Sequence, residues 1–214
     1  LQYHVLATSV EASAVPAGPN APVASLDGEN VFATRNTTGV FINGVKVKTA
    51  DVAASNGIIH IVEKVLIPSG GLDIVGLAAA NPNFSYLVAA VLRADASGTS
   101  ISGALKAAGP LTVFAPVNQA FIAAGFPTIA SIQAADPNTL KNILLYHVIA
   151  ARVFSSDLAE GAKPATAGGG TVTITLAGGA KVKGNANPVA SNIAITNVVA
   201  ANGVVHAIDR VLLP

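Results

Sequence analysis

The sequence predicts an α+β fold, in which a helical segment is followed by a segment of strands. Hydrophobic residues make up 51% of the 214 positions and charged residues 11%, a composition typical of a chain that folds around an apolar core. Between residues 73 and 147 the apolar residues recur at helical spacing, and from residue 170 onward they alternate with polar ones. Helices followed by strands, rather than strictly alternating with them, indicate the α+β class.

Two blocks of sequence occur twice. The block Tyr3-His4-Val5-Leu6-Ala7 returns 143 residues later as Tyr146-His147-Val148-Ile149-Ala150. A longer block, residues 56–68, returns 146 residues later as residues 202–214, with residue type retained throughout. Similarity of this kind within one chain indicates a repeated structural unit.

The repeat predicts how the chain is divided. Residues 69–214 hold a complete copy, whereas residues 1–68 match only its second half. We place the boundary at Pro68-Ser69-Gly70-Gly71, because turn-forming residues of this kind separate domains. The two offsets differ by three residues, and we expect a longer loop at Gly168-Gly169-Gly170 to hold the extra ones.

The first part of the complete copy has signals for helices. A short helix is expected over Asp73–Ala80, and a second is expected to begin at Asn83 as its cap. In the second helix, apolar residues fall on one face, at Leu87, Val88, Val91 and Leu92. A third helix is expected after Asp136-Pro137, because a capping residue followed by proline is a common helix start. This helix should lead directly into Tyr146-His147.

Between these helices the pattern changes to a strand and a further helix. Leu111–Pro116 is rich in β-forming residues and ends at proline, which predicts a strand. Asn118 follows at a position from which it would cap a helix that contains Phe121 and Ile122.

The last part of the chain predicts strands. Apolar and polar residues alternate over residues 172–183 around Ala177-Gly178-Gly179, which indicates a hairpin. Two further strands are expected at Ile193–Val199 and Val204–Leu213. The connection between them contains Asn202-Gly203, a pair that favours positive backbone φ angles.

Composition excludes several classes of protein. The formal net charge is +1 and no basic cluster occurs, so nucleic acid is not an expected partner. No apolar run reaches the roughly 18 residues that a membrane span requires. The chain has no cysteine, which excludes disulfides and thiolate sites. It starts at Leu1 and has no methionine, so we expect a fragment whose leader has been lost.

The four histidines occupy only two repeated positions, His4 with His147 and His60 with His206. Repetition favours a structural role, in which each ring is buried and hydrogen-bonded. The acidic residues nearest to them in sequence are Glu63 and Asp209, each three residues after a histidine. On a strand this spacing puts the two side chains on opposite faces, so no metal site is predicted.

No catalytic set is found, and we predict that the protein is not an enzyme and binds no cofactor. A Gly-x-Ser-x-Gly nucleophile motif does not occur, and the acidic residues of the complete copy read mostly as caps or turns. The glycine runs lie between predicted strands, whereas phosphate-binding loops precede helices. A hydrolase is retained as a minor alternative.

Three segments of the complete copy together resemble the landmark segments of fasciclin-like domains. They are Thr112-Val113-Phe114-Ala115-Pro116-Val117-Asn118-Gln119-Ala120-Phe121, Tyr146-His147, and Asn202-Gly203-Val204-Val205-His206. The resemblance covers the complete copy and the matching half of the first one. It implies a wedge-shaped β-sandwich of about seven strands with a helical edge. It also implies a protein that is secreted, periplasmic or on the cell surface and serves adhesion or matrix assembly.

The resemblance also suggests which residues make adhesion contacts. In animal members the tyrosine-histidine segment is associated with integrin-dependent adhesion, which points to Tyr146 and His147 and to their counterparts Tyr3 and His4. A second family motif, Asp-Ile, corresponds to Asp51-Val52 in the first copy. The complete copy has Asn197-Val198 there and lacks the carboxylate that an integrin metal ion would take up.

We therefore predict a non-catalytic adhesion module that binds a cell-surface or matrix protein or glycan. The alternative is a carrier of a lipophilic small molecule such as a carotenoid, held in a cleft between helices and strands. Because residues 1–68 lack helices to cover their apolar face, we also expect them to pack on missing upstream chain, on the complete copy or on a second molecule. Self-association through this half is one such possibility.

Overall fold

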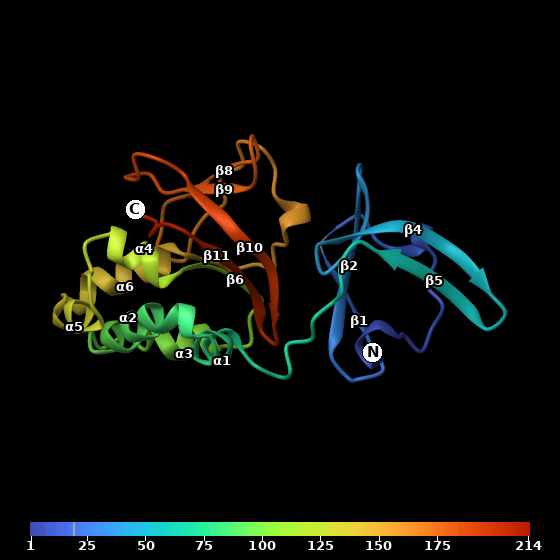
Figure 1. The fold of residues 1–214 in the computed structure, drawn as a ribbon, viewed down its shortest axis with the longest axis horizontal. Coiled ribbons are helices and arrows are strands. Elements are labelled where there is room, and N and C mark those ends of the chain that lie inside the picture. Colours follow the sequence, from blue (N-terminus) through green and yellow to red (C-terminus); the bar gives the residue numbers. More distant parts are fainter. Residues whose placement is uncertain (19) are drawn as a thin grey trace.

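The computed structural model describes residues 1–18 and 20–214, and it contains two β-sheets that lie apart from each other (Figure 1). We call residues 1–68 the first unit and residues 69–214 the second unit. The first unit carries strands and short 3-10 turns, whereas the second carries both helices and strands. The hairpin of β4 and β5 extends away from the second unit, and no α-helix of the described residues covers it (Figure 1).

The first unit is an antiparallel sheet of five strands that pair in sequence order. Two 3-10 turns, Gln2–His4 and Ala12–Ala14, precede the strands. The strands are β1 (Ala21–Ala24), β2 (Asn30–Asn36), β3 (Gly39–Ile42), β4 (Val45–Ala54) and β5 (Gly57–Val62). Because β5 is last in the order, it forms one edge of the sheet.

The second unit has a six-stranded sheet with the order β7-β6-β11-β10-β9-β8. Its strands are β6 (Leu111–Pro116), β7 (Val148–Ile149), β8 (Thr173–Thr175), β9 (Lys181–Lys183), β10 (Ser191–Ala200) and β11 (Gly203–Ile208). The pair of β6 and β11 is parallel, and the other pairs are antiparallel. Strand β6 is second in this order and lies between β7 and β11.

The helices of the second unit pack together beside this sheet (Figure 1). They are α1 (Ile74–Ala80), α2 (Ser85–Asp95), α3 (Ile101–Lys106), α4 (Asn118–Ala123), α5 (Ile129–Ala134) and α6 (Pro137–Tyr146), with 3-10 turns at Pro82–Phe84 and Ser155–Asp157. The α+β class is confirmed. The described strands of this unit number six rather than about seven.

Two of the predicted helix starts are confirmed. The Asp73 carboxylate accepts a hydrogen bond from the Gly76 amide and caps α1. The Asp136 carboxylate caps α6 by accepting from the Thr139 amide, with Pro137 at the first helical position. Both caps use groups within the same turn, so they can be recognised from local sequence.

Two other predicted caps are wrong. Asn83 lies inside the turn Pro82–Phe84, which the Asn81 side chain caps instead. Asn118 begins α4 but does not cap it, because its side-chain oxygen accepts from the Tyr86 amide at 3.1 Å, in the first turn of α2. The Asn118 amide group also donates to the Pro82 carbonyl. This side chain therefore joins two helices that are distant in sequence.

The predicted strands are found, but one is shorter than expected and one turn has different backbone angles. The hairpin of β8 and β9 is confirmed, but β11 ends at Ile208 rather than at Leu213. Neither Asn202 nor Gly203 has a positive φ angle, so the turn does not require glycine for that reason. A Cβ at Gly203 would instead lie 2.2 Å from the Leu111 carbonyl oxygen. Glycine is needed there because β6 approaches closely.

The expectation for the Gly168–Gly170 loop is wrong. Both units have a loop of the same length at this position, closed by a similar hydrogen bond. In the first unit the Ser25 amide donates to the Glu29 carbonyl, and in the second unit the Thr166 amide donates to the Gly170 carbonyl. The second unit is longer elsewhere, since residues 184–190 connect β9 to β10 where only Asn43 and Gly44 connect β3 to β4.

The second unit has cores on both faces of its sheet. On one face the helices cover β6 and β11, and this core includes Leu87, Val91, Val113 and Val205. On the other face, Phe114 and Tyr146 pack with apolar residues of β8 and β9. The first unit has only a small buried cluster, Tyr3, Val31 and Leu66.

No single helix in the described parts of the chain has both the length and the apolar character of a membrane span. The helices Ile74–Ala80 and Pro82–Asp95 have the length and apolar character of a span only when taken together. The chain bends by 107° where they join. In the second unit their apolar side chains Ile74, Leu87 and Val91 are part of the core.

Candidate adhesion surface

The first repeated histidine position holds the end of each unit in place. His147 Nε2 accepts a hydrogen bond from the Leu212 amide at 2.8 Å, and His4 Nε2 accepts from the Leu66 amide at 3.0 Å. In the second unit, His147 Nδ1 also bonds to the Ile143 carbonyl at 2.7 Å. The Ile143 carbonyl can only accept, so Nδ1 carries the proton and Nε2 is the acceptor.

The second repeated position ties a strand to a preceding loop. The Nε2 atom of His206 lies 2.9 Å from the Val153 carbonyl, and that of His60 lies 2.8 Å from the Val10 carbonyl. Each carbonyl oxygen accepts from its ring. In both units Nδ1 of the ring accepts from a backbone amide of the neighbouring strand, Asn197 or Asp51. All four rings are therefore engaged by the chain's own backbone.

Burial changes the chemistry of these rings in the second unit. Burial lowers the pKa of His147 to about 4 and also lowers the pKa of His206. Both rings are therefore neutral at physiological pH, which suits an acceptor nitrogen. A neutral ring that already makes two hydrogen bonds is poorly placed to act as a catalytic base on an outside substrate.

The Asp-Ile-type motif lies at an irregular point of β4 and of β10. Asp51 and Asn197 both have positive φ angles, 57° and 63°, at register shifts in their strands. The Asp51 carboxylate accepts from the Ala12 amide at 2.9 Å, and the Asn197 side-chain oxygen accepts from the Ser155 amide at 2.8 Å. Aspartate and asparagine thus hold equivalent loops with equivalent bonds.

The Asp209 carboxylate, three residues after His206 in the sequence, is engaged by other side chains and backbone. Asp209 follows the end of β11, and its carboxylate accepts from Ser191 and Asn192. Among residues 1–18 and 20–214, no three His, Asp or Glu side chains are grouped closely enough to hold a metal ion.

The two units contact each other through an aromatic and a cationic side chain that the sequence analysis did not single out. The Arg152 guanidinium lies 3.8 Å from the ring centroid of Phe32, and the Phe32 and Phe154 centroids are 6.1 Å apart. Arg152 also donates to the Gly203 carbonyl, and burial lowers its pKa. Stacking of this kind favours a fixed arrangement of the two units.

Polar groups extend this contact. The Asn20 amide donates to the Asp157 carboxylate at 2.7 Å and to the Arg152 carbonyl at 3.3 Å, and the Asn36 amide donates to the Ser156 carbonyl. The first unit thus packs on the second through β2 and the segment before β1. It does not use β5 for this contact.

The second unit also contains an apolar cavity of about 180 Å³ between α1, α2, α3 and β6. Its lining includes Leu87, Val91, Leu105 and Val113, with Ser102 and Lys106 as polar residues on α3. His147 reaches the lining, but its ring nitrogens are bonded to the backbone.

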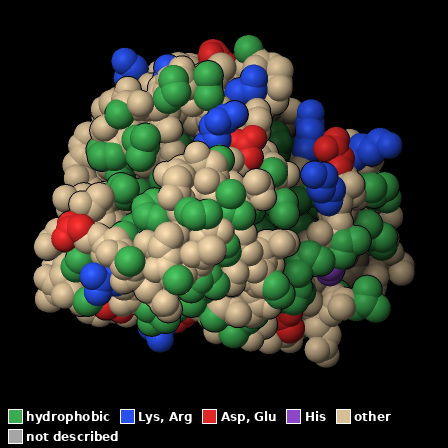
Figure 2. Space-filling model, turned by 60° about the vertical axis from the view of Figure 1, so that its left-hand side comes forward, with side chains coloured by type: hydrophobic (Ala, Val, Ile, Leu, Met, Phe, Trp, Pro, Cys, Tyr) green, Lys and Arg blue, Asp and Glu red, His purple; other side chains and the backbone are tan. Residues whose placement is uncertain are grey.

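On the face of the molecule in Figure 2, charged side chains gather in the upper and right-hand parts, and apolar side chains form several patches between neutral ones. The chain has 12 basic and 11 acidic residues. A surface of this kind favours contacts based on shape and apolar area over long-range electrostatic attraction.

The Fasciclin domain family model matches residues 1–68 and 82–214. This chain belongs to the fasciclin family. The two matched stretches correspond to the two units that carry the repeated histidines.

Several curated proteins are similar to this fasciclin chain. Protein sll1483 of Synechocystis is 40% identical over 144 residues, which cover 67% of this chain and 74% of that protein. Immunogenic protein MPB70 of Mycobacterium bovis is 29% identical over 97% of this chain and 92% of its own. Transforming growth factor-beta-induced protein ig-h3 of Sus scrofa is 29% identical over 82% of this chain, which spans only 24% of that relative.

A solved structure has the same fold. The domain pair of the insect cell adhesion molecule Fasciclin I matches with a TM-score of 0.55 and 19% identity, over 92% of this chain and 72% of that one. At this identity the match concerns the fold alone.

The six candidate contact residues of this fasciclin chain do not form one surface. Tyr146 and His147 are 1% and 2% exposed, and Tyr3 is also buried. Their hydroxyl and ring groups bond to backbone groups or, for Tyr3, also to Asn43. His4, Asp51 and Val52 are exposed. Burial of the tyrosine-histidine pair depends on tertiary packing, which local sequence does not reveal.

Proposed function

We propose that this fasciclin protein is a non-catalytic adhesion or interaction module that acts outside the cell, at the cell surface or in the periplasm. The observation that carries the proposal is that the repeated histidines bond to the chain's own backbone, while apolar and neutral side chains make up most of the face in Figure 2. Membership of the fasciclin family, which the resemblance links to adhesion and matrix assembly, supports the same function. The partner is a protein or glycan of the matrix or of another cell.

Within this proposal, direct contact is assigned to exposed members of the family motifs. Asp51 and Val52 lie on β4, the exposed hairpin strand of the first unit. In the second unit, Asn197 is half-buried and lies close to the first unit. A Cβ placed at Gly44 would lie 2.5 Å from the Asn197 Nδ2 atom. The buried pair Tyr146 and His147 bonds to backbone groups inside the second unit and does not touch the partner.

Adhesion is tested with purified protein coated on a surface. Cells or matrix-coated beads should attach in greater number than to an inert protein of similar size, and soluble protein should compete. Equal attachment to both coatings, with no partner recovered by crosslinking, would remove the basis of the proposal.

The Asp51→Asn variant then asks whether an integrin-type metal contact is involved. Asparagine at the equivalent position, Asn197, makes the same hydrogen bond, so the fold should be unaffected. If the carboxylate binds a partner's cation, Asp51→Asn abolishes cation-dependent attachment. Unchanged attachment would assign adhesion to other residues, and Asp27→Asn, on an exposed turn, is the control.

A carrier of a lipophilic small molecule is the second candidate, supported by the apolar cavity of about 180 Å³. Sites for drug-sized ligands usually measure about 300–1,000 Å³, whereas an engineered cavity of about 150 Å³ binds benzene. As it stands, the cavity therefore suits one ring or a short branched chain. A carotenoid would have to widen it by separating α1 and α2.

This candidate is tested by binding of an apolar fluorescent probe and by the absorbance of protein purified from its native source. Ala78→Leu fills the cavity, whereas Ala79→Leu adds the same volume on the exposed side of α1. Probe binding that Ala78→Leu alone removes would support a carrier. Binding by neither protein, together with a colourless preparation, would exclude it.

A further inference from the structure

The apolar cavity of about 180 Å³ lies inside the second unit. Its lining comes from α1, α2 and α3, from β6, and from the chain that runs from the end of α6 into β7. These helices and strands pack on one another around one core. The cavity is therefore a space between elements that cover each other, unlike the face of β5, which no α-helix of the described residues covers.

The inner end of the cavity offers a ligand only apolar contacts. Phe114 of β6, Leu144 of α6 and Val148 of β7 line it and are buried. His147 also reaches this end, but both of its ring nitrogens bond to backbone groups. A polar group placed there would lose its water without gaining a partner, which is unfavourable. The inner end therefore suits a ring or a branched aliphatic chain.

The outer end of the cavity carries the only cation in its lining, among the residues that the structure describes. Lys106, at the end of α3, is exposed, and so is Leu92 of α2. Ser102 precedes Lys106 by four residues, so both side chains lie on one face of α3. The lining thus changes from apolar at its buried end to cationic at its opening.

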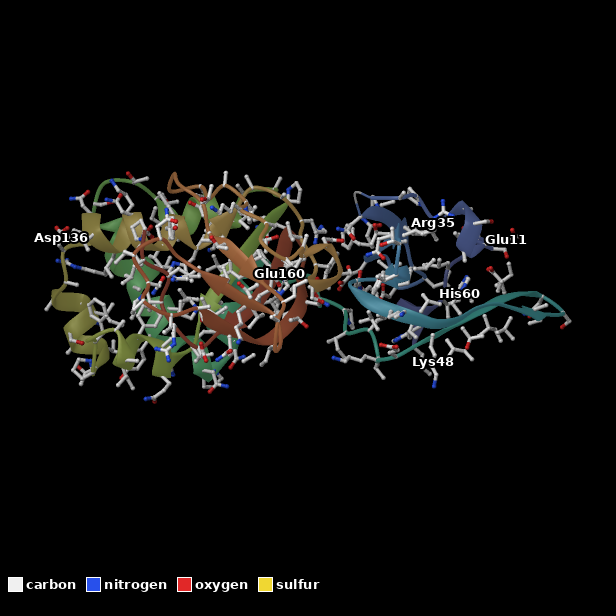
Figure 3. All side chains as sticks on the ribbon, turned by 90° about the horizontal axis from the view of Figure 1, so that it is seen from above. Glu11, Arg35, Lys48, His60, Asp136 and Glu160 are labelled. Carbon is white, nitrogen blue, oxygen red and sulfur yellow. The ribbon has the colours of Figure 1, made fainter. Side chains whose placement is uncertain are left out.

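Acidic side chains of the described residues are not part of the lining. In Figure 3, Asp136 lies at the end of the second unit farthest from the first unit, and Glu160 lies nearer to the first unit than Asp136 does. Neither residue reaches the cavity. Lys106 therefore sets the sign of the charge that a ligand meets at the opening.

The nearest candidate for a competing acid is Asp95, at the end of α2. Its carboxylate accepts hydrogen bonds from the Ile101 and Ser102 amides, which begin α3. Lys106 ends the same helix, and a rise of about 1.5 Å per residue puts the two ends roughly 8 Å apart. Asp95 is thus held by backbone amides at the opposite end of α3 from Lys106.

We propose that this cavity binds a small apolar acid, with its ring or branched chain among α1, α2 and β6 and its carboxylate at the opening beside the Lys106 ammonium. This inference rests on the second candidate function, a carrier of a lipophilic small molecule, and names the ligand class. The apolar part is limited to about one ring, because an engineered cavity of about 150 Å³ binds benzene. A carboxylate is ionised at neutral pH and forms a charge-assisted hydrogen bond with an ammonium group.

The test compares three ligands that share a benzene ring and a two-carbon linker. Hydrocinnamate has an anionic head, phenethyl alcohol a neutral one and phenethylamine a cationic one. NMR titration of the full chain measures each affinity. Hydrocinnamate should bind most tightly, with a dissociation constant in the millimolar range or below. The alcohol should bind about two- to fivefold more weakly, as expected for loss of one exposed ion pair, and the amine more weakly still.

The variant Lys106→Glu should reverse this order, so that phenethylamine binds most tightly and hydrocinnamate least tightly. Binding of the neutral alcohol should stay unchanged, which shows that the cavity itself is intact. Lys106→Ala should make the acid and the alcohol bind about equally. The matched control is Lys163→Glu, which changes the same charge at an exposed residue outside the lining and should retain the original order.

The position of the ligand and the nature of the contact are tested separately. Ala78→Leu, which fills the cavity, should remove binding of all three ligands, whereas Ala79→Leu should not. High salt should narrow the difference between acid and alcohol, because exposed charge pairs are screened.

The proposal is overturned if the three ligands bind equally, if their order survives Lys106→Glu, or if hydrocinnamate binds equally well to Ala78→Leu. Equal binding of the three ligands that Ala78→Leu removes would leave the carrier function in place without the preference for acids. Absence of binding by all three would remove both. Adhesion on coated surfaces is a separate readout that none of these results changes.

Discussion

Strands β5 and β11 have nearly the same sequence pattern but different surroundings. Each begins with Asn-Gly, carries a histidine that bonds to a distant carbonyl, and pairs with a long irregular strand. Helices and β6 cover β11, whereas β5 is an open edge. The comparison shows that the repeated residues are sufficient for the hairpin and its histidine bond. Burial of the apolar face requires additional chain.

The largest expected difference between the units is at their paired glycines. Gly203→Ala should destabilise the second unit by about 3–5 kcal/mol, because the methyl group collides with the Leu111 carbonyl. Gly57→Ala should be neutral or stabilising by about 0.5 kcal/mol, because it restricts only the unfolded chain. Urea denaturation of both variants measures this. Similar losses at both positions would mean that β5 is already covered in solution.

The paired asparagines should differ almost as much. Asn202→Ala leaves the Ile74 amide and two carbonyls without their buried partner, for a loss of about 3 kcal/mol. Asn56→Ala removes an exposed side chain and should change stability by less than about 0.5 kcal/mol. Urea titrations of the two variants measure these changes in the free energy of unfolding. A large loss for Asn56→Ala would mean that β5 is already covered in solution.

The buried histidine should make the second unit sensitive to acid. Because burial lowers the folded-state pKa of His147 from 6.5 to about 4, the unfolded chain binds the proton first as pH falls. The contribution of the neutral ring to the free energy of unfolding is therefore complete above pH 6.5. About 3 kcal/mol of this contribution is lost when the pH falls to 4.

Denaturation at a series of pH values checks this, with His147→Gln as the comparison. The variant should be less stable at neutral pH and have a shallower pH dependence. An equal slope in both proteins would assign the acid sensitivity to other groups.

The smallest expected effect concerns the contact between the units. Phe32→Ala removes the ring beneath Arg152 and beside Phe154. The free energy of unfolding should fall by about 1–2 kcal/mol. Small-angle scattering should also show a broader range of distances between the units. Arg35→Ala, an exposed change on the same strand, is the control and should alter neither quantity. Unchanged scattering for Phe32→Ala would mean that polar contacts alone hold the arrangement.

Features that depend on neighbours in sequence could be predicted. Alternation of apolar and polar residues located the hairpin of β8 and β9, and caps such as Asp73 and Asp136 mark helix starts because a side chain reaches only its own first turn. The structural role of the histidines also followed from the repetition. Each position proved to bond to the backbone in both units.

Features that depend on distant segments could not be predicted. Asn118 matches a local capping pattern, but its side chain bonds to α2, which only the packed helices bring within reach. Tyr146 and His147 fit an adhesion motif and are nevertheless buried. The Arg152 contact with Phe32 joins residues 120 positions apart and has no sequence signal.

The sequence alone determined the α+β class, the repeat, the fasciclin resemblance and the local helix starts, because periodicity and short-range hydrogen bonds are properties of neighbouring residues. Only the tertiary structure decided which copies of the repeated residues are buried, why Gly203 must be glycine, and where the apolar cavity lies. Burial and close approach depend on which distant segments cover a strand. Two strands of similar sequence can therefore differ in exposure and in the contacts that they make.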